Sequence, residues 1–130
     1  MGKLDTFMQE FSRELKLENP LTPSMPGVYF LPIDENLSIT INEGLSSISF
    51  TSTIAPTPKV HKEAFFQEML EGNLFGQGTQ GGFLSLSEDG KNIILTNKLS
   101  LESNYDVFAG ALEDFIVTVD FWRDEALQHK

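Results

Sequence analysis

The chain has 130 residues, enough for one domain with a single hydrophobic core, and 40% of them are hydrophobic. Its formal net charge of −10 argues against binding to nucleic acid or anionic lipid, since both require Lys and Arg near phosphates. The absence of cysteine excludes a disulfide framework, a thiolate zinc site and a cysteine nucleophile.

Residues 3–17 are predicted to form an amphipathic helix. Asn19-Pro20 ends it, because the residue before proline avoids helical backbone angles. The apolar residues at helical spacing share one narrow arc: Leu4, Phe7, Met8, Phe11 and Leu15.

Three strands of an antiparallel meander are expected next, over residues 27–33, 37–41 and 45–53. The second and third alternate apolar and polar side chains, which predicts a sheet with one buried face and one wetter face.

The first of these strands is apolar on both faces, in the pairs Val28–Phe30 and Tyr29–Leu31. One pair must cover the core, and the alternation alone does not say which. Pro32 cannot donate to a strand ladder, so the strand is predicted to lie at an edge or to contain a bulge. An uncovered apolar face beside an open edge is a site where an extended peptide can bind.

Residues 60–74 are predicted to form a second helix with two apolar arcs instead of one. A surface helix needs a single apolar stripe, so two arcs imply cover on both sides. One cover is the sheet, and the other is either a second subunit or a loop of the same chain. The first arc holds Val60, Ala64, Leu70 and Leu74, and the opposite arc holds Phe65, Phe66 and Met69.

Gly76, Gly78 and Gly81 have the spacing G-x-G-x-x-G of a dinucleotide-binding loop. Such a loop requires a strand before the glycines and a helix after them, so that the pyrophosphate meets a helix N-terminus. Here a helix precedes the glycines and a strand follows. We therefore expect no nucleotide binding, and interpret the glycines as a helix stop and a turn.

Residues 83–87 and 92–99 are predicted to form a hairpin with Asp89-Gly90 in its turn. A long last helix follows, with Ser103 as its N-cap and Asp106 completing a variant of the capping box. Its core-facing stripe is Tyr105, Phe108, Ala111, Leu112, Phe115, Ile116, Val119, Trp122 and Ala126.

The reverse side of this helix carries two apolar residues, Val117 and Phe121, one turn apart. They are hard to explain as core residues. The carboxylates around them are best interpreted as a solvated face, although the acidity of the chain would favour a basic partner: Glu113, Asp114, Asp120, Asp124 and Glu125.

The predicted fold is a single α+β domain over residues 1–130, a twisted antiparallel sheet flanked by helices in the order α-β-β-β-α-β-β-α. His61 and His129 have no partner that suggests a metal site or a general base. Without a recognisable nucleophile, base or oxyanion site, the pattern favours a binding protein over an enzyme, with no cofactor. A small enzyme with acidic residues at an unrecognised site is the alternative.

Neither a signal peptide nor a run of about 20 apolar residues is present, so we expect a cytoplasmic protein that does not insert into membranes. The run "EMLEGNLFGQGTQGGFLSLSEDGKNIILTNKL" and the closing "ALEDFIVTVDFWRDEAL" resemble the Tir-chaperone (CesT-like) family, class I chaperones of bacterial type III secretion. The resemblance is strongest from Met69 to Leu127.

This resemblance implies a homodimer that binds an extended N-terminal segment of secreted effector proteins, without ATP or metal. A non-chaperone adaptor or regulator of the same fold, binding a folded partner, is the alternative. The implied dimer interface is Phe65, Phe66, Met69, Leu70, Leu74, Leu84 and Leu86. The implied effector-binding residues are Phe7, Phe11, Val28, Tyr29, Phe30 and Leu31.

Overall fold

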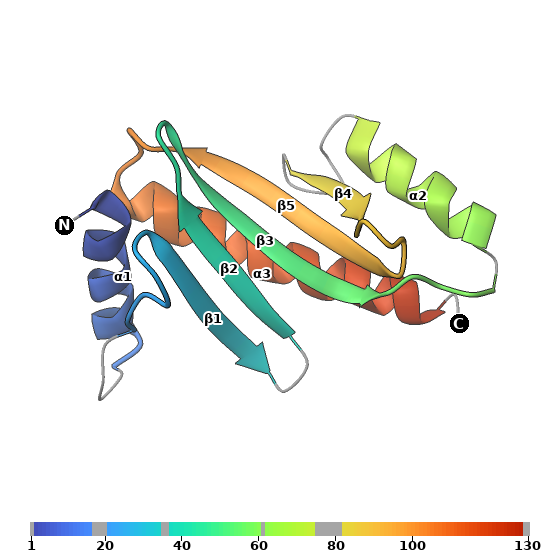
Figure 1. The fold of residues 1–130 in the computed structure, drawn as a ribbon, viewed down its shortest axis with the longest axis horizontal. Helices are drawn as coiled ribbons and strands as arrows, with labels where there is room; N and C mark the ends of the chain where they lie inside the picture. The colour runs from blue at the N-terminus through green and yellow to red at the C-terminus, as the bar shows by residue number, and fades with distance from the viewer. Residues whose placement is uncertain (1, 17–20, 35–36, 61, 75–81, 129–130) are drawn as a thin grey trace.

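Three helices and five strands alternate along the chain in the predicted order, as a computed structural model shows (Figure 1). The structure describes residues 2–16, 21–34, 37–60, 62–74 and 82–128. The elements are α1 (Lys3–Glu14), β1 (Val28–Asp34), β2 (Leu37–Glu43), β3 (Ser47–Pro56), α2 (Lys62–Leu74), β4 (Phe83–Leu86), β5 (Asn92–Ser100) and α3 (Tyr105–Gln128).

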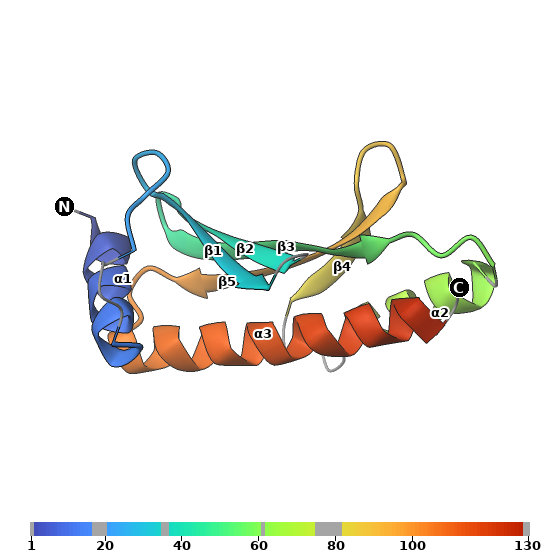
Figure 2. The same cartoon turned by 90° about the horizontal axis from the view of Figure 1, so that it is seen from below.

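The five strands form one antiparallel sheet in the order β1-β2-β3-β5-β4, so β1 and β4 are its two edges. Helix α3 runs along one face of this sheet (Figure 2). Helix α1 crosses one end of the layered structure, and α2 packs beside β4 at the other end (Figures 1 and 2). This architecture confirms the predicted α+β fold.

The core lies between α3 and the sheet. Phe50 of β3 packs against Phe108 and Phe115 of α3, with ring centroids 5.8 and 5.5 Å apart. Helix α1 closes one end of the core through Phe7, whose ring lies 4.9 Å from that of Phe108. Helix α2 closes the other end. The stripe predicted for the last helix therefore faces the sheet, with six of its members buried: Phe108, Leu112, Phe115, Val119, Trp122 and Ala126.

The opposite face of the sheet is polar, and no helix of the described residues covers it (Figure 2). One row of backbone partners crosses all five strands. Its centre consists of threonines, and each of its ends is a partly exposed phenylalanine: Phe30, Thr40, Thr51, Thr96 and Phe83. The alternation seen in the sequence therefore separates a buried face from a wetter one, as predicted.

Three helix boundaries differ from the prediction. Helix α2 begins at Lys62 instead of residue 60, so Val60 of the predicted arc precedes the helix. Helix α1 ends at Glu14 instead of residue 17, because Lys16 adopts the left-handed conformation with φ 57°. The N-cap of α3 is Asn104 and not Ser103: the Val107 N–H donates to Asn104 Oδ1 (2.9 Å). Both residue types are good N-caps, so sequence preference did not separate them. Gly76, Gly78 and Gly81 lie outside the described residues.

Candidate functional site

Strand β1 presents one of its two apolar pairs to the outside. Tyr29 and Leu31 are buried beneath the sheet, whereas Val28 is partly exposed and Phe30 is 58% exposed. Pro32 lies within this edge strand opposite Ser38, and the register shifts between Pro32 and Asp34. The structure thus confirms the edge position that the proline predicted, and it places a register shift directly after Pro32.

The open edge of β1 offers few backbone groups. The Val28 C=O accepts the Ser24 N–H (2.9 Å) and the Val28 N–H donates to the Met25 C=O (3.0 Å), so both groups of Val28 point away from β2. Backbone groups alternate in direction along a strand. The groups of Phe30 and the carbonyl of Pro32 therefore also point outward, and an added strand has a donor only at Phe30 within this stretch.

The first helix contributes its aromatic stripe to the core rather than to a surface groove. Phe7 and Phe11 are buried, and the Phe7 ring also lies 5.9 Å from that of Tyr105. Four of the six predicted effector-binding residues are thus core residues in the folded chain, namely Phe7, Phe11, Tyr29 and Leu31. Val28 and Phe30 are the two that face outward.

Carboxylates hold the start of α1 against the sheet. The Tyr29 hydroxyl donates to Asp5 Oδ1 (2.6 Å), the Gly2 N–H donates to Asp5 Oδ2 (3.1 Å), and the Leu4 N–H donates to Glu43 Oε1 (2.6 Å). Negative charge is favourable at a helix N-terminus. The hydrogen bond from Tyr29, followed by that from Gly2, lowers the pKa of Asp5, while burial and the bond to Asp5 raise the pKa of Tyr29.

The end of α1 is fixed as well. The Tyr105 hydroxyl of α3 donates to Glu14 Oε2 (2.8 Å), and burial, followed by this bond, raises the pKa of Tyr105. Helix α1 is therefore tied to β1, to the β2 end and to α3. These contacts give the β1 edge a rigid support.

The other edge of the sheet is closed by one side chain, that of Asn73 in α2. Its amide accepts the Leu84 N–H (2.7 Å) and donates to the Leu84 C=O (3.0 Å), replacing a neighbouring strand at the middle of β4. Sequence reasoning missed this residue. A strand that adds to the sheet beside Leu84 would have to displace Asn73, so β1 is the more accessible edge.

The two apolar arcs of α2 have different surroundings. Phe65 and Met69 are buried by the same chain, with the Phe65 ring 6.3 Å from that of Trp122. The helix lies so close to α3 that a Cβ on Gly72 would be 2.7 Å from the Trp122 ring.

The opposite arc of α2 faces outward, with Leu70 69% and Leu74 70% exposed. Among the other predicted dimer residues, Phe66 is partly buried, Leu84 is buried and Leu86 is exposed. The exposed members of the predicted interface are thus Leu70, Leu74 and Leu86.

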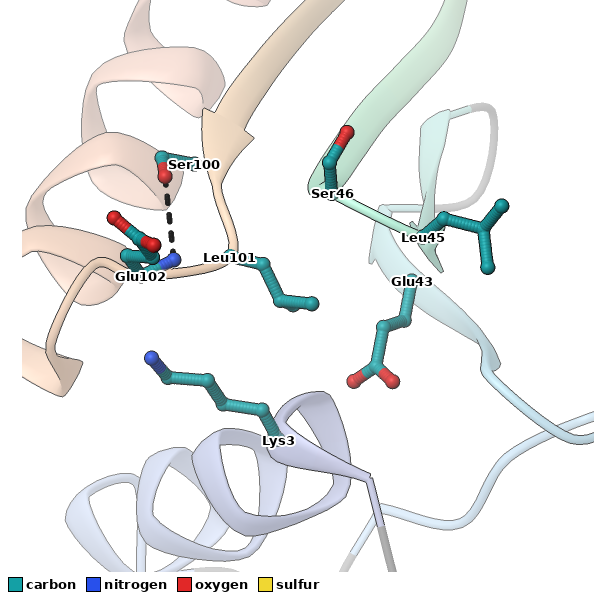
Figure 3. A pocket seen from close by; sticks show the side chains of 7 residues that line it. All are labelled: Lys3, Glu43, Leu45, Ser46, Ser100, Leu101 and Glu102. Carbon is teal, nitrogen blue, oxygen red and sulfur yellow. Dashed lines mark hydrogen bonds between the residues drawn. The ribbon is translucent and has the colours of Figure 1, made fainter.

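An open pocket of about 600 Å³ lies at the end of the sheet beside the start of α1 (Figure 3). Lys3 extends into it from α1, while Glu43 and Glu102 flank it. Two of its groups are already used locally, since Glu43 binds the Leu4 N–H and Ser100 Oγ accepts the Glu102 N–H (3.2 Å). In the described part of the chain, no three His, Asp or Glu residues are grouped so that they could hold a metal ion. No helix within those residues is long and apolar enough to span a membrane.

Known proteins are similar to this chain in sequence and in fold. The sequence model of the Tir chaperone protein (CesT) family matches residues 6–123. A protein of Chlamydia pneumoniae, CPj0713/CpB0740, is 26% identical over 121 residues, which is 92% of each chain.

Three solved structures have a similar fold at 16% identity. A chain of the ExsC–ExsE complex has a TM-score of 0.77 and covers 97% of both chains. A chain of the HopA1–SchA chaperone–effector complex has a TM-score of 0.73 over 93% of both chains. YbjN from E. coli has a TM-score of 0.62 over 97% of this chain and 92% of its own.

Proposed function

Since this chain belongs to the Tir chaperone protein (CesT) family, the type III secretion chaperones that its sequence resembles, we propose that it binds an extended N-terminal segment of an effector protein. Binding in the cytoplasm keeps that segment soluble and competent for export. The observation that carries this proposal is the edge of β1, where Phe30 is exposed beside outward-pointing backbone groups.

The chemistry of this edge fits an extended peptide better than a folded partner. An added strand forms main-chain hydrogen bonds with the edge, and its alternate side chains contact the apolar surface there. Because Pro32 removes one donor, the apolar contacts with Val28 and Phe30 must supply much of the affinity. The likeness to a chain of the HopA1–SchA chaperone–effector complex supports an effector as the class of partner.

We also propose that the protein is a homodimer through the outer arc of α2. Leu70 and Leu74 lie one turn apart on this arc and are more than two-thirds exposed. In a two-fold dimer the same patch meets itself, so two such arcs would bury four leucine side chains.

The edge of β1 is tested with two double variants and a matched control. Val28→Asp/Phe30→Asp should lower the amount of retained effector at least about tenfold, because charges replace the apolar contacts. Tyr29→Asp/Leu31→Asp should unfold the domain, since both side chains are buried. Leu45→Asp, at a fully exposed residue of the β2–β3 turn, should change neither the retention of the effector nor the fold.

The measurement is affinity capture of the tagged protein from its native cells, with mass spectrometry of the retained proteins. Circular dichroism and light scattering of each variant verify the fold and the mass. Retention of the same effector by Val28→Asp/Phe30→Asp at the wild-type level would exclude β1 as the binding edge.

The alternative function is an adaptor or regulator that binds a folded partner. The likeness to YbjN, a proposed transcription regulator of E. coli, supports this alternative. A synthetic peptide from the N-terminal segment of the captured partner separates the two functions. The chaperone should bind this unfolded peptide, whereas an adaptor should bind the intact, folded partner alone.

A further inference from the structure

Helix α3 has an outward face that carries two exposed apolar side chains. Val117 is 62% exposed and Phe121 is 52% exposed, one turn apart on the same side of the helix. Gly110, two turns before Val117, is on this side as well, and a Cβ added there would meet no other atom within 4 Å. The Phe121 ring is held edge-on against the Trp122 ring at 5.4 Å, so this side chain has a defined position.

Carboxylates surround this apolar pair. At about 100° per residue, all of the acidic positions lie within about 60° of Val117 on the helix surface. Arg123 is a neighbouring cation, and it binds Asp120 (2.9 Å). The exposed acidic residues of the face are Asp106, Glu113, Asp114, Asp120 and Asp124. We call Val117, Phe121 and these five residues the outer face of α3.

We propose that the outer face of α3 is a second docking surface, which binds a basic amphipathic helix of a partner protein. Apolar residues three and four apart on the partner would contact Val117 and Phe121, and Lys or Arg on either side would meet the carboxylates. This partner site is independent of the effector segment on β1, because β1 is an edge strand of the sheet and the outer face of α3 points away from the sheet (Figure 2).

Charge decides between the possible occupants. Pairing this face with the same face of a second copy would bring two sets of five carboxylates together, and like charges oppose such a contact. Nucleic acid and anionic lipid are repelled for the same reason. A basic protein segment is the one occupant that both the apolar pair and its acidic surround attract.

The probe is a fluorescein-labelled synthetic helix of about 18 residues, some five turns, with Leu along one face and Lys elsewhere. Its binding to the full chain is followed by fluorescence anisotropy. Val117→Ser/Phe121→Ser should weaken binding about tenfold or more, because the apolar contacts are lost. Leu15→Ser/Leu45→Ser is the matched control, which removes two exposed apolar side chains elsewhere and should leave binding unchanged.

Three neutral substitutions test the charges independently. Glu113→Gln/Asp114→Asn/Asp124→Asn should weaken binding and flatten its dependence on salt between about 50 and about 300 mM. A peptide with the same composition in scrambled order, which cannot form an apolar face, should bind at least about tenfold more weakly.

Three results would overturn the proposal. Unchanged binding to Val117→Ser/Phe121→Ser would show that the peptide docks elsewhere. Equal binding of the scrambled peptide would show attraction to net charge alone. A lower molecular mass of the folded Val117→Ser/Phe121→Ser variant in light scattering would make this face a contact between subunits.

Discussion

Tyr29 and Tyr105 are the two tyrosines of the chain, and each donates its hydroxyl hydrogen to a carboxylate of α1. Asp5 receives the bond at the start of the helix and Glu14 receives it at the end. The ring of each tyrosine is at least partly buried while its oxygen reaches the helix. These two residues therefore connect helix α1 to the sheet and to α3 through polar contacts as well as through packing.

Tyr29→Phe should lower the free energy of unfolding by about 1 kcal/mol at pH 7, the usual contribution of one such hydrogen bond. The bond lowers the pKa of Asp5 in the folded state below its ordinary value of 3.8. Its contribution is thus present above about pH 4 and is lost as the pH falls through the lowered pKa.

Urea denaturation at pH 7 and at about pH 3 measures this dependence, as the free energy difference between wild type and Tyr29→Phe. The difference should be smaller at the lower pH. If the free energy difference is the same at both pH values, the stabilisation by the Tyr29 hydroxyl does not depend on the ionised form of Asp5.

Gly82, at the start of β4, lies against the neighbouring strand β5. A Cβ there would collide with the backbone carbonyl oxygen of Thr96 and with the side chain of Asn97. Because a strand backbone cannot move aside easily, Gly82→Ala should destabilise the fold by about 1–3 kcal/mol.

Gly110→Ala is the opposite case and the control. A Cβ at this position on the outer face of α3 meets nothing, and alanine favours a helix interior over glycine by about 1 kcal/mol. Thermal unfolding should therefore give a lower midpoint for Gly82→Ala and a higher one for Gly110→Ala. Equal shifts in the two midpoints would contradict the close approach at β4.

At the scale of elements, the two edges of the sheet differ in whether their backbone groups have partners. Edge β1 keeps outward-pointing backbone groups, whereas the amide of Asn73 occupies the backbone groups of Leu84 in β4. Helix α2 thus binds β4 through the side chain of Asn73. The buried side chains of Phe65 and Met69 add apolar contacts that hold the helix in place.

Asn73→Ala should destabilise the protein by about 1–3 kcal/mol, because it leaves the N–H and C=O of Leu84 without their partner. Hydrogen exchange of the Leu84 amide should become faster, and urea denaturation gives the free energy. Gln67→Ala removes an exposed contact with Glu71 on the same helix and should change stability by less than about 0.5 kcal/mol. A comparable loss in both variants would contradict a specific role for the contact between Asn73 and Leu84.

Periodicity predicted the elements well where one face of an element is apolar. The stripe of α3 is an example, since its aromatic residues recur at helical spacing and are buried as predicted. The pairs of β1 were undecided because both are apolar. Only the pairing with β2 shows that Tyr29 and Leu31 lie over the core.

The candidate site was harder to predict for two physical reasons. An apolar stripe on a helix is attracted to the nearest core, so Phe7 and Phe11 are buried instead of lining a surface groove. The role of Asn73 depends on Leu84, eleven residues later. A sequence pattern within one helix or strand cannot predict such a contact.

At the scale of the whole molecule, three exposed apolar surfaces lie on different elements: the edge of β1, the outer arc of α2 and the outer face of α3. This separation allows one subunit to bind an effector segment, a second subunit and a basic helix on different elements. The outer arc of α2 is the surface that we propose joins the two subunits.

Leu70→Glu/Leu74→Glu should convert the protein to a folded monomer, because charges would be buried without partners in the proposed interface. Light scattering behind a sizing column should give twice the chain mass of 14.5 kDa for wild type and that mass for the variant. Leu45→Glu, at a fully exposed turn, should remain dimeric. A monomeric wild type at tens of micromolar would contradict the proposal. Met69 is unsuitable for this test, since it is buried within the subunit.

The contacts of α1 also determine the order of events during synthesis on the ribosome. Phe7 packs on Tyr105 and Phe108, and Glu14 accepts a hydrogen bond from the Tyr105 hydroxyl, so α1 needs α3, which is synthesised later. At about 5–20 residues per second, its aromatic stripe stays uncovered for several seconds of translation. Ribosome-bound chains that end before Tyr105 should therefore expose α1 to protease, and the N-terminal helix becomes protected only when α3 emerges.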